Sequence, residues 1–482
     1  RTYFISKGVI SMKKLFRTML CAAVAAAALC VSAFAADTVP AKQGDFYVEV
    51  NGQYVTFTDA VPQIKDDRSC LPFAAVLKQL GFADDHIRWN GDTRTVTADK
   101  DGVTVALTID QKSITVTRNG KTETVTTDVA PYIDAKTSRT YVPLGLVADT
   151  LGYKVGWDAK QGTVIIDDVD AILAANKETY TLMDKYMEYS RTFTEKNQQV
   201  KGSYGADVAM DMVTEDGKAS TGFKMDGTYQ MTMAGSTQMQ FSTRMNMDAK
   251  VTADGQDAGA ALGDMFPMTL NMELRGDLEK GTFYLQSPEL AAMIGQPGMA
   301  NAWFKLDMKG MFDSMSAQTG MSYTELMQTV MTAQGKSFSQ LLPEMLKSAA
   351  LTDASATTKD TLALLNALCA DSAFKKSGSD YVSTLDMGGE GKLTMTLYTS
   401  GGKVNGYAMT MTVEADGVKA AVNAEVKNSK MTAKLVFGIA MDDLTMQMNM
   451  TMDGAYAATN SKPATEPPAG ATVVDMVSPI GG

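Results

Sequence analysis

Apolar and polar residues alternate along much of the second half of the chain. Residues 444–453 read LTMQMNMTMD, so methionine occupies every second position and Thr, Gln or Asn fills the gaps. The same period of two recurs in six further segments: 239–247 (with Thr243 as one interruption), 268–274, 393–397, 407–413, 418–426 and 431–437. Because neighbouring side chains of a strand point to opposite faces, the pattern predicts an antiparallel sheet with one polar and one covered apolar face.

Helical spacing appears on either side of the first strands. Apolar residues from Ile172 to Phe193 recur at mostly three- and four-residue intervals, which predicts a helix that Asp167 or Asp168 caps. A second helical region, 321–373, is predicted as an insertion in the sheet. We therefore predict one domain over 169–456. The Pro-rich tail 457–482, with NSKPATEPPAGAT, is predicted to be disordered.

Residues 40–168 contain an internal repeat. Six residues of the first copy return in the second: Pro62, Arg68, Pro72, Leu80, Gly81 and Trp89 as Pro131, Arg139, Pro143, Leu151, Gly152 and Trp157. In each copy the second proline is placed to open a short helix and the glycine to terminate it. A Trp-bearing strand, a turn and a β-branched strand follow. Each copy is therefore predicted to be one helix–strand unit, and the repeated Arg, Gly, Trp and helix-opening Pro residues are predicted to have structural roles.

The repeated R-x-x-x-P and L-G motifs resemble the N-terminal domain of copper amine oxidases over about 48–168. In those enzymes this domain is a projecting stalk, and the chemistry resides elsewhere. Copper-dependent oxidation there needs three His and a modified Tyr, whereas this chain has one His, His86. The resemblance therefore implies a stalk module without oxidase activity. In exported proteins of Firmicutes-like bacteria, similar stalks look like surface or envelope modules.

The order of elements over about 170–455 is similar to the LolA-like lipoprotein-carrier fold. That fold is a curved half-barrel sheet closed by helices over an apolar cavity. Together, the two resemblances and the periodicities predict an α+β protein. Its first part is a small stalk domain with two helix–strand repeats, and its second a long curved antiparallel half-barrel covered by helices.

Residues 1–35 are predicted to be an upstream extension followed by a signal peptide. Lys13, Lys14 and Arg17 precede an apolar run, and Ala33-Phe34-Ala35 forms a cleavage site, so we expect the mature chain to begin at Ala36. We therefore expect a secreted, envelope-associated protein without a transmembrane span in its mature form. The net charge of −11 argues against a nucleic-acid partner. Cys70 and Cys369 are predicted to be buried thiols rather than a disulfide.

Methionine distinguishes the two parts. None occurs between residues 20 and 182, and 33 of the 35 lie from Met183 onward. A flexible thioether suits an apolar surface that adapts to its contents, so we predict a cavity for a hydrophobic or lipid-like ligand. The predicted ligand-binding residues are Met239, Phe241, Met245, Met247, Met268, Met272, Met395, Met409, Met411, Met446, Met448, Met450 and Met452.

Two other interpretations of the methionines remain open. The first is a structural or adhesive surface protein with a packed Met-rich core. The second is a Cu(I)-binding protein, since thioethers are soft ligands that suit this ion. We predict no enzyme, catalytic residue, cofactor or resident metal centre. His86, beside Asp84 and Asp85, is interpreted as a surface histidine, because no nucleophile is marked near it. The predicted partners are a lipid or hydrophobic molecule and a cell-wall or surface component.

Overall fold

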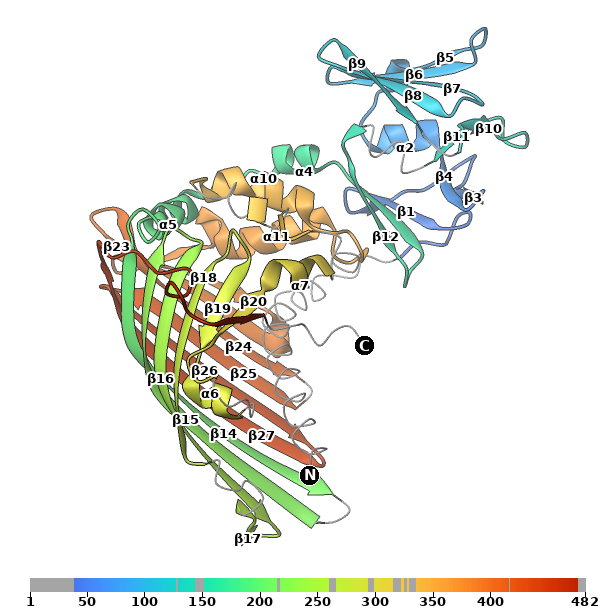
Figure 1. The fold of residues 1–482 in the computed structure, drawn as a ribbon. Coiled ribbons are helices and arrows are strands. Elements are labelled where there is room, and N and C mark those ends of the chain that lie inside the picture. Colours follow the sequence, from blue (N-terminus) through green and yellow to red (C-terminus); the bar gives the residue numbers. More distant parts are fainter. Residues whose placement is uncertain are drawn as a thin grey trace. The chain divides into compact units, whose positions relative to one another are not determined.

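The structure is a computed structural model (Figure 1). It describes residues 39–475 except 127–128, 144–150, 215–216, 260–265, 294–298, 315–321, 325–326, 329–334 and 416. The predicted signal peptide therefore lies outside the described residues, as does part of the predicted helical insertion 321–373. Among the described residues, no helix has the length and apolarity needed to cross a bilayer.

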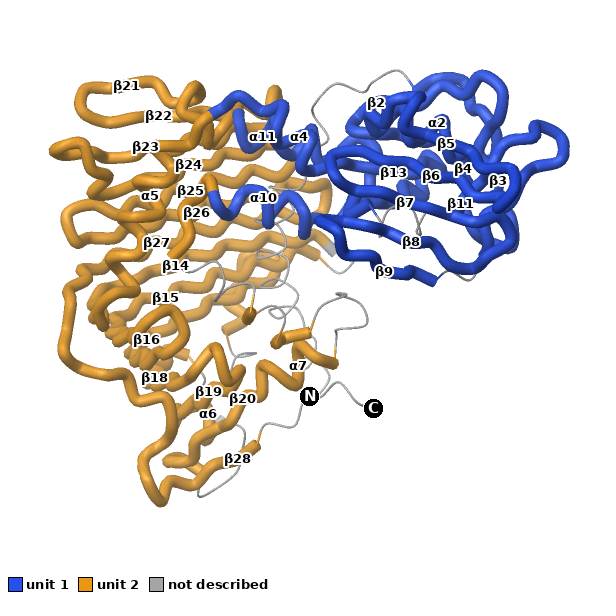
Figure 2. The backbone as a smooth tube through the Cα atoms, turned by 90° about the horizontal axis from the view of Figure 1, so that it is seen from above, with its two compact units in different colours: residues 1–178, 340–366 blue, residues 179–339, 367–482 orange. Residues whose placement is uncertain are grey.

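The chain divides into two compact units (Figure 2). Unit 1 comprises Arg1–Glu178 and Gln340–Asn366, and unit 2 comprises Thr179–Ser339 and Ala367–Gly482. The division differs from our predicted boundary at 168–169 by ten residues. It also assigns the middle of the predicted helical insertion to unit 1. Residues 340–366 belong to unit 1 because they contact β12 (Lys154–Asp158) and β13 (Thr163–Asp167).

Unit 1 contains three small sheets. The first has the order β12 (Lys154–Asp158), β13 (Thr163–Asp167), β1 (Tyr47–Val50), β2 (Gln53–Tyr54). The second has the order β10 (Tyr132–Ile133), β11 (Thr140–Pro143), β4 (Arg68–Pro72), β3 (Gln63–Lys65). The third is a meander of β5 (Ile87–Asn90), β6 (Thr95–Lys100), β7 (Val103–Thr108), β8 (Ser113–Arg118), β9 (Lys121–Thr126). The helices are α2 (Phe73–Gln79), a 3-10 turn (Asp84–His86), α4 (Val169–Ala175) and most of α10 (Phe338–Ser348) and α11 (Thr358–Cys369).

The two sequence repeats form matching hairpins. Trp89 of β5 pairs with Val96 of β6, and Trp157 of β12 pairs with Val164 of β13. Strands β4 and β11, which precede the two helical positions, pair antiparallel so that Leu71 lies opposite Val142. Equivalent positions of the two copies therefore meet at the centre of unit 1, where both side chains are buried.

The predicted helix ends are confirmed where the structure describes them. Helix α2 begins directly after Pro72 and ends before Gly81, whose φ is +83°. The amide of Gly81 donates to the carbonyl of Lys78, and that of Phe82 donates to Leu77, each at 3.0 Å. These two bonds form a Schellman cap, which needs a left-handed residue at this position. Gly152 has the matching φ of +75°. Pro143 ends β11, and the residues that follow it lie outside the described part.

Segment 340–366 packs on the second repeat within unit 1. Gly156 of β12 lies so close to Leu351 that a Cβ at this position would sit 1.8 Å from the Leu351 carbonyl oxygen. Buried carboxylates fix the backbone of the segment: Asp158 accepts from the Ala354 amide (3.1 Å) and Asp167 from the Thr358 amide (2.9 Å). These contacts are made by backbone groups of the segment, so the spacing of its hydrophobic residues could not predict them.

Unit 2 is built on one 15-stranded sheet. Its order is β21 (Lys375–Ser377), β22 (Asp380–Asp386), β23 (Gly391–Ser400), β24 (Lys403–Ala415), β25 (Val418–Lys427), β26 (Lys430–Met441), β27 (Leu444–Ala458), β14 (Gln198–Thr214), β15 (Gly217–Ala234), β16 (Gln238–Ala253), β18 (Met268–Asp277), β19 (Thr282–Gln286), β20 (Trp303–Asp307), β28 (Val473–Asp475), with β17 (Gln256–Asp257) beside β16. The other elements are α5 (Thr181–Arg191), α6 (Pro288–Met293), α7 (Met308–Ser314) and 3-10 turns at Asp371–Ala373 and Gly388–Glu390.

All strand pairs of this sheet are antiparallel except β20–β28. The central strands are long, up to the 18 residues of β15, whereas strands are usually about 5–6 residues. Twist accumulated over such strands curls the sheet (Figure 1). The prediction of an α+β protein with a curved antiparallel half-barrel is thereby confirmed. In unit 2, helices α5, α6 and α7 contact β24, β18 and β19 respectively.

The helix predicted from residue 169 is two helices. Asp168, one of the two predicted caps, accepts a hydrogen bond from the Ala171 amide (2.9 Å) and starts α4. Asn176 follows the last residue of α4, and its side chain accepts bonds from the Glu178 amide and from Asn366. Asparagine competes in this way with the helical backbone and ends helices. A fresh helix, α5, begins at Thr181.

Asp371 anchors α5 to unit 2 from outside the helix. Its carboxylate accepts bonds from the amides of Thr181 (2.9 Å) and Leu182 (2.8 Å) and from the Thr179 hydroxyl (2.8 Å). Burial opposes ionisation, but these hydrogen bonds outweigh it and lower the pKa of Asp371. The stabilisation is therefore present above the unfolded pKa of about 4 and is lost as the pH falls through the lowered folded pKa.

Replacing Asp371 by alanine is expected to destabilise unit 2 by about 0.5–2 kcal/mol, because two amides of the first turn of α5 lose their acceptor. Chemical unfolding monitored by circular dichroism measures this change. Asp371→Asn keeps an acceptor oxygen and is expected to retain most of the stability near pH 7. Equal losses in the two variants would contradict a capping role for this side chain.

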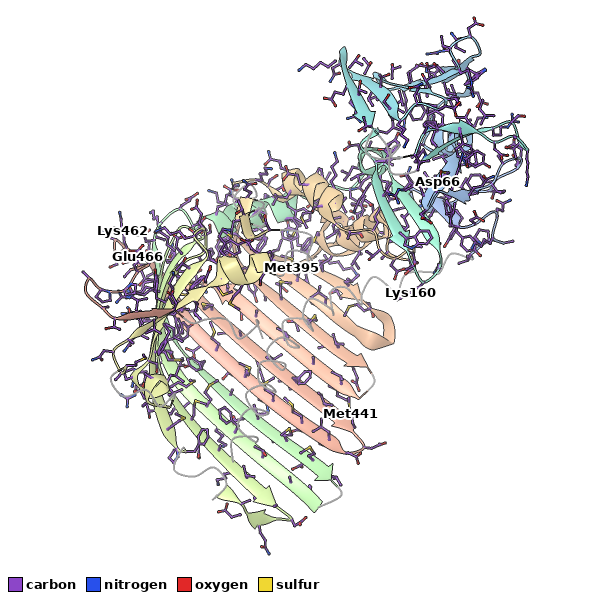
Figure 3. The ribbon with its side chains drawn as sticks, turned by 45° about the vertical axis from the view of Figure 1, so that its right-hand side comes forward. Asp66, Lys160, Met395, Met441, Lys462 and Glu466 are labelled. Atoms are coloured by element: carbon purple, nitrogen blue, oxygen red, sulfur yellow. The ribbon has the colours of Figure 1, made fainter. Side chains whose placement is uncertain are left out.

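The tail differs from our prediction of disorder as far as the structure describes it. Ala457 and Ala458 end β27, and Val473–Asp475 form β28 beside β20. Between them lies Glu466, labelled in Figure 3. Its carbonyl accepts from Arg275 (2.9 Å), and Lys280 lies 3.5 Å from its carboxylate. Prolines suit the segment between β27 and β28, because its contacts with Gln240 and Arg275 need few amide donors. Composition alone therefore misled the prediction.

Candidate functional site

The register of the sheet places the predicted methionines on one face of unit 2. Across ten strands from β22 to β18, one row consists of Leu385, Leu393, Met411, Val422, Leu435, Met450, Ala206, Met225, Met247 and Met268. No member of this row is polar. Neighbouring strands are about 4.8 Å apart, so the row extends over roughly 43 Å along the curl of the sheet. We call the face that carries this row the Met face.

A second row runs parallel to the first, two residues further along each strand. It consists of Ser383, Met395, Met409, Ala424, Ala433, Met452, Tyr204, Gly227, Met245 and Leu270. The remaining predicted ligand-binding residues are Met239, Phe241, Met272, Met446 and Met448. They follow the same period of two on β16, β18 and β27, and therefore also belong to the Met face.

The Met face is unevenly covered. Met446 and Met448 are 5% and 4% exposed, and Met395 is 4% exposed, which matches a packed core. Met409 is 38% exposed, and Met441, at the far end of β26, is 58% exposed. Met450, Met452 and most other members of the two rows are half-buried. Figure 3 shows Met395 and Met441 on well-separated strands of the sheet. The described part of the face thus combines closely packed and accessible apolar side chains.

Helix α5 covers one end of the Met face with aromatic side chains. Tyr186 packs edge-on against Tyr407 of β24, with ring centroids 5.2 Å apart. The hydroxyls of Tyr189 and Tyr456 lie 3.0 Å apart, and the ring centroid of Phe193, two residues beyond the end of α5, lies 4.8 Å from that of Tyr456. Both strand tyrosines share the side of their strands with the methionines. At the end of the face that carries Tyr407 and Tyr456, a helix therefore covers the sheet as predicted.

A small polar island interrupts the Met face between β14 and β16. The Tyr204 hydroxyl lies 2.7 Å from that of Thr243, which also bonds the Thr228 carbonyl (2.9 Å). Thr243 was the one interruption of the alternating pattern, and here it is buried on the apolar side. Tyr229 lies beside this pair and its hydroxyl, which is buried over Gly454, has no hydrogen-bond partner among the described residues.

Strands β14 and β15 supply residues of the Met face that our prediction omitted. They include Val208, Met210, Phe223, Met225 and Met231. The period of two is present in YGADVAMDMV and in FKMDGTYQMTM, but Gly202 and Gly227 interrupt its apolar phase. In the sheet these positions are needed for close packing, since a Cβ on Gly227 would lie 2.7 Å from the Tyr204 ring. Gly227 thus makes room for the Tyr204 ring, whereas a Cβ on Gly202 would lie 1.8 Å from the Asp453 carbonyl oxygen of the neighbouring strand.

The opposite face of the same strands is polar. Asn449, Thr451 and Asp453 of β27 alternate with the methionines, and all three are exposed. A cavity of about 710 Å³ lies over β23–β27, with Thr412, Lys419 and Gln447 among its lining residues. These side chains have the phase of the polar face. Met448, one of the predicted ligand-binding residues, is also among its lining residues, so the cavity includes residues of both phases.

Methionine pairs lie directly opposite one another on neighbouring strands. Met225, Met247 and Met268 are consecutive in the first row, on β15, β16 and β18. Directly paired side chains have Cβ atoms about 4.5–5.5 Å apart, so their thioethers can converge. Among the described residues, no group of three or more His, Cys, Asp or Glu side chains could hold a metal. This triplet is the arrangement most suited to Cu(I) in the described sheet.

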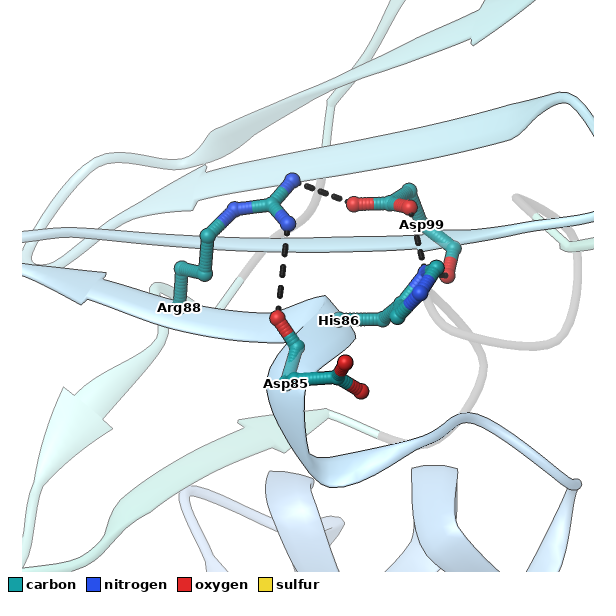
Figure 4. Close-up of polar contacts among 4 residues, drawn as sticks. All are labelled: Asp85, His86, Arg88 and Asp99. Carbon is teal, nitrogen blue, oxygen red and sulfur yellow. Dashed lines mark hydrogen bonds and ion pairs between the residues drawn. The ribbon is translucent and has the colours of Figure 1, made fainter.

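His86 belongs to an exposed ion-pair cluster in unit 1 (Figure 4). Its Nδ1 lies 2.7 Å from Oδ2 of Asp99, whose other oxygen pairs with Arg88. We had considered Asp84 and Asp85 as its neighbours, but the partner comes from β6, across the hairpin. The hydrogen bond that His86 donates to the Asp99 carboxylate raises the pKa of His86. The cluster contains no nucleophile, which fits the interpretation of His86 as a surface residue.

The single histidine gives a direct test of this cluster. We expect NMR titration to show a His86 pKa above the ordinary value of about 6.5, and Asp99→Asn to return it toward that value. The charged pair adds stability below about pH 6.5, and this is lost as the pH rises through the raised pKa. Arg88→Gln is the control, because it leaves the Asp99 carboxylate in place. An unshifted His86 in the parent protein would contradict the geometry.

The repeated residues of the stalk have different surroundings. Trp89 and Trp157 are 48% and 46% exposed. Arg139 donates through Nε to Asp59 (2.6 Å), while Arg68 bonds the Asp67 carbonyl (3.3 Å).

Cys70 and Cys369 are buried free thiols, as predicted. Burial raises the pKa of Cys369 to about 11, so this thiol is poorly reactive.

Comparison with known families identifies the first part of the chain. Residues 49–166 match the family model described as the copper amine oxidase N-terminal domain. This segment is similar to the N-terminal domain of copper amine oxidases. The matched range lies within the 48–168 predicted from the repeated motifs, and it covers the non-catalytic domain of that family only. The comparison with curated proteins gave no match.

Two solved structures show slight similarity. The first, titled "Lipid-protein interactions in lipovitellin", has a TM-score of 0.23 and 10% identity over 55% of this chain and 26% of that chain. The second is the translocator domain of autotransporter NalP from Neisseria meningitidis. It has a TM-score of 0.16 and 6% identity over 60% of this chain and 97% of that chain. The chain thus spans about a quarter of the lipovitellin chain. The LolA-like resemblance of residues 170–455 stays a prediction.

Proposed function

We propose that this is an exported, non-enzymatic cell-envelope protein that binds a hydrophobic or lipid-like ligand on the Met face. The copper amine oxidase N-terminal-like domain would place it at the cell surface, in contact with a cell-wall or surface component. One observation carries the proposal: an uninterrupted apolar row across ten strands, many of whose side chains are half-buried. Accessible apolar surface of this extent marks a place for a partner or ligand.

Methionine supports this function better than a β-branched core would. Its unbranched side chain has three rotatable bonds and fills irregular space, so one surface can accommodate acyl chains of different shapes. Val, Ile and aromatic residues are favoured in strands when only packing is required. The acidic net charge leaves apolar burial, rather than attraction to anionic headgroups, as the source of affinity.

Two measurements separate this function from its alternatives. The purified protein without residues 1–35 is incubated with a fluorescent fatty acid, and saturable uptake is expected. It is also titrated with Cu(I) against a chromogenic chelator, and we expect the chelator to retain the ion. Retention of Cu(I) by the protein, lost in Met247→Leu, would instead support the triplet Met225–Met247–Met268 as a copper site. Failure of both would favour the structural or adhesive protein with a packed core.

A further inference from the structure

A groove of about 770 Å³ lies in the domain that we proposed to contact a cell-wall or surface component, and the inference below rests on that part of the proposed function. The groove lies between α2, the β5–β6 hairpin and the residues around Asp59 and Arg139. Ala74 and Ala75 of α2 contribute to its lining, and their small side chains leave space between the larger ones. The volume falls in the range of about 300–1,000 Å³ that is typical of small-molecule sites.

The groove presents apolar and polar surface together. Trp89 and Ile133 line it and are 48% and 37% exposed, although large apolar side chains of this domain are otherwise mostly buried. Arg139 contacts one carboxylate oxygen of Asp59 through both Nε and NH2, each at 2.6 Å. Side-chain exposures of 55% and 54% leave this pair open to solvent. Donors and acceptors therefore stand in the same groove as an accessible indole.

We propose that this groove binds a glycan chain. A pyranose ring has an apolar C–H face, which suits the electron-rich face of Trp89, and a rim of hydroxyls that both donate and accept. The Asp59 carboxylate can only accept and the Arg139 guanidinium can only donate, so the pair satisfies both roles of a hydroxyl. Hydroxyls of Thr56 and Thr140, which also line the groove, extend the polar side. The occupant is thus amphipathic and uncharged, not a nucleotide or a lipid.

A proline-rich peptide is the competing occupant, and the groove fits it less well. Such peptides bind between several aromatic rings that form parallel ridges. Here Trp89 is the one aromatic side chain exposed in the described groove, beside Phe73, which is buried. The inference does not rest on the Met face, because all lining residues belong to unit 1. A negative result for either site would leave the other unaffected.

The internal repeat supplies matched controls for the test. The purified protein is titrated with an N-acetylglucosamine tetrasaccharide by calorimetry, and saturable binding is expected. Trp89→Ala is expected to weaken it at least tenfold, whereas Trp157→Ala, at the equivalent repeat position with a ring packed on Phe46, is expected to leave it within twofold. Likewise, Arg139→Ala is expected to weaken binding several-fold and Arg68→Ala to preserve it.

Thermal unfolding of each variant separates loss of binding from loss of fold. No binding by the parent protein, or equal losses in Trp89→Ala and Trp157→Ala at unchanged melting temperature, would overturn the proposal. Binding of a proline-rich peptide, but not the tetrasaccharide, that Trp89→Ala abolishes would assign the groove to the competing class.

Discussion

Replacing Met450 by aspartate is expected to reduce fatty-acid uptake at least tenfold, while replacing its neighbour Asn449 by aspartate is expected to leave uptake unchanged. The two residues are adjacent on β27 but lie on opposite faces of the sheet. Met450 occupies the middle of the apolar row, between Leu435 and Ala206. A carboxylate there meets an apolar ligand without a polar partner, which costs well over the 1.4 kcal/mol of a tenfold effect.

The test compares fatty-acid uptake by variants of the Met face and of the polar face. Met450→Leu keeps apolar volume and is expected to retain uptake within about threefold, so it separates a change of chemistry from a change of side chain. Circular dichroism and thermal unfolding show whether Met450→Asp is folded. If it unfolds, Met409→Asp replaces it, because Met409 is 38% exposed and tolerates a charge better. Equal uptake by variants of both faces would contradict binding on the Met face.

Replacing Gly156 by alanine is expected to separate segment 340–366 from the second repeat in unit 1. The added Cβ would lie 1.8 Å from the carbonyl oxygen and 2.3 Å from the Cβ of Leu351, so the segment must move. Overpacking of this kind costs about 1–3 kcal/mol. Movement of the segment also lengthens the bonds that the Ala354 and Thr358 amides donate, so the buried carboxylates of Asp158 and Asp167 would each lose a hydrogen bond.

The effect of Gly156→Ala is measured by thermal unfolding and by limited proteolysis of segment 340–366. Gly91→Ala is the control, since its Cβ would meet nothing nearer than the Trp89 indole nitrogen at 3.7 Å. We expect a lower melting temperature and new cleavage within the segment for Gly156→Ala alone. Identical behaviour of the two variants would show that Leu351 does not pack on β12 as described.

Alternation of apolar residues predicted those strands in which apolar and polar side chains alternate without interruption or nearly so. Strands β16, β18 and β23 to β27 follow the predicted segments, and every predicted methionine of the site lies on one face. The pattern is informative there because a one-residue change of register would move a whole set of side chains to the other face. The paired repeat was equally legible, since Pro72 and Gly81 have roles that few other residues can fill.

Other features depend on contacts between distant residues and left no periodic signal. Asp371 and Asp167 bind backbone amides of other segments, and an amide looks the same in every sequence. Asp99 reaches His86 across a hairpin, which sequence proximity to Asp84 and Asp85 obscured. The edge strand β28 is three residues long, too short to show a period. Gly202 and Gly227 obscured the apolar period of β14 and β15, because these positions leave space for the β27 backbone and for the Tyr204 ring respectively.

The central claim is that the Met face binds a hydrophobic or lipid-like ligand rather than forming only a packed core. Its most direct test is organic extraction of the purified protein without residues 1–35, followed by mass spectrometry. We predict a co-purifying lipid or other hydrophobic molecule in a near-stoichiometric amount, reduced in Met450→Asp and retained in Asn449→Asp. An extract without such a molecule, from a folded protein that also takes up no fluorescent fatty acid, would contradict the account.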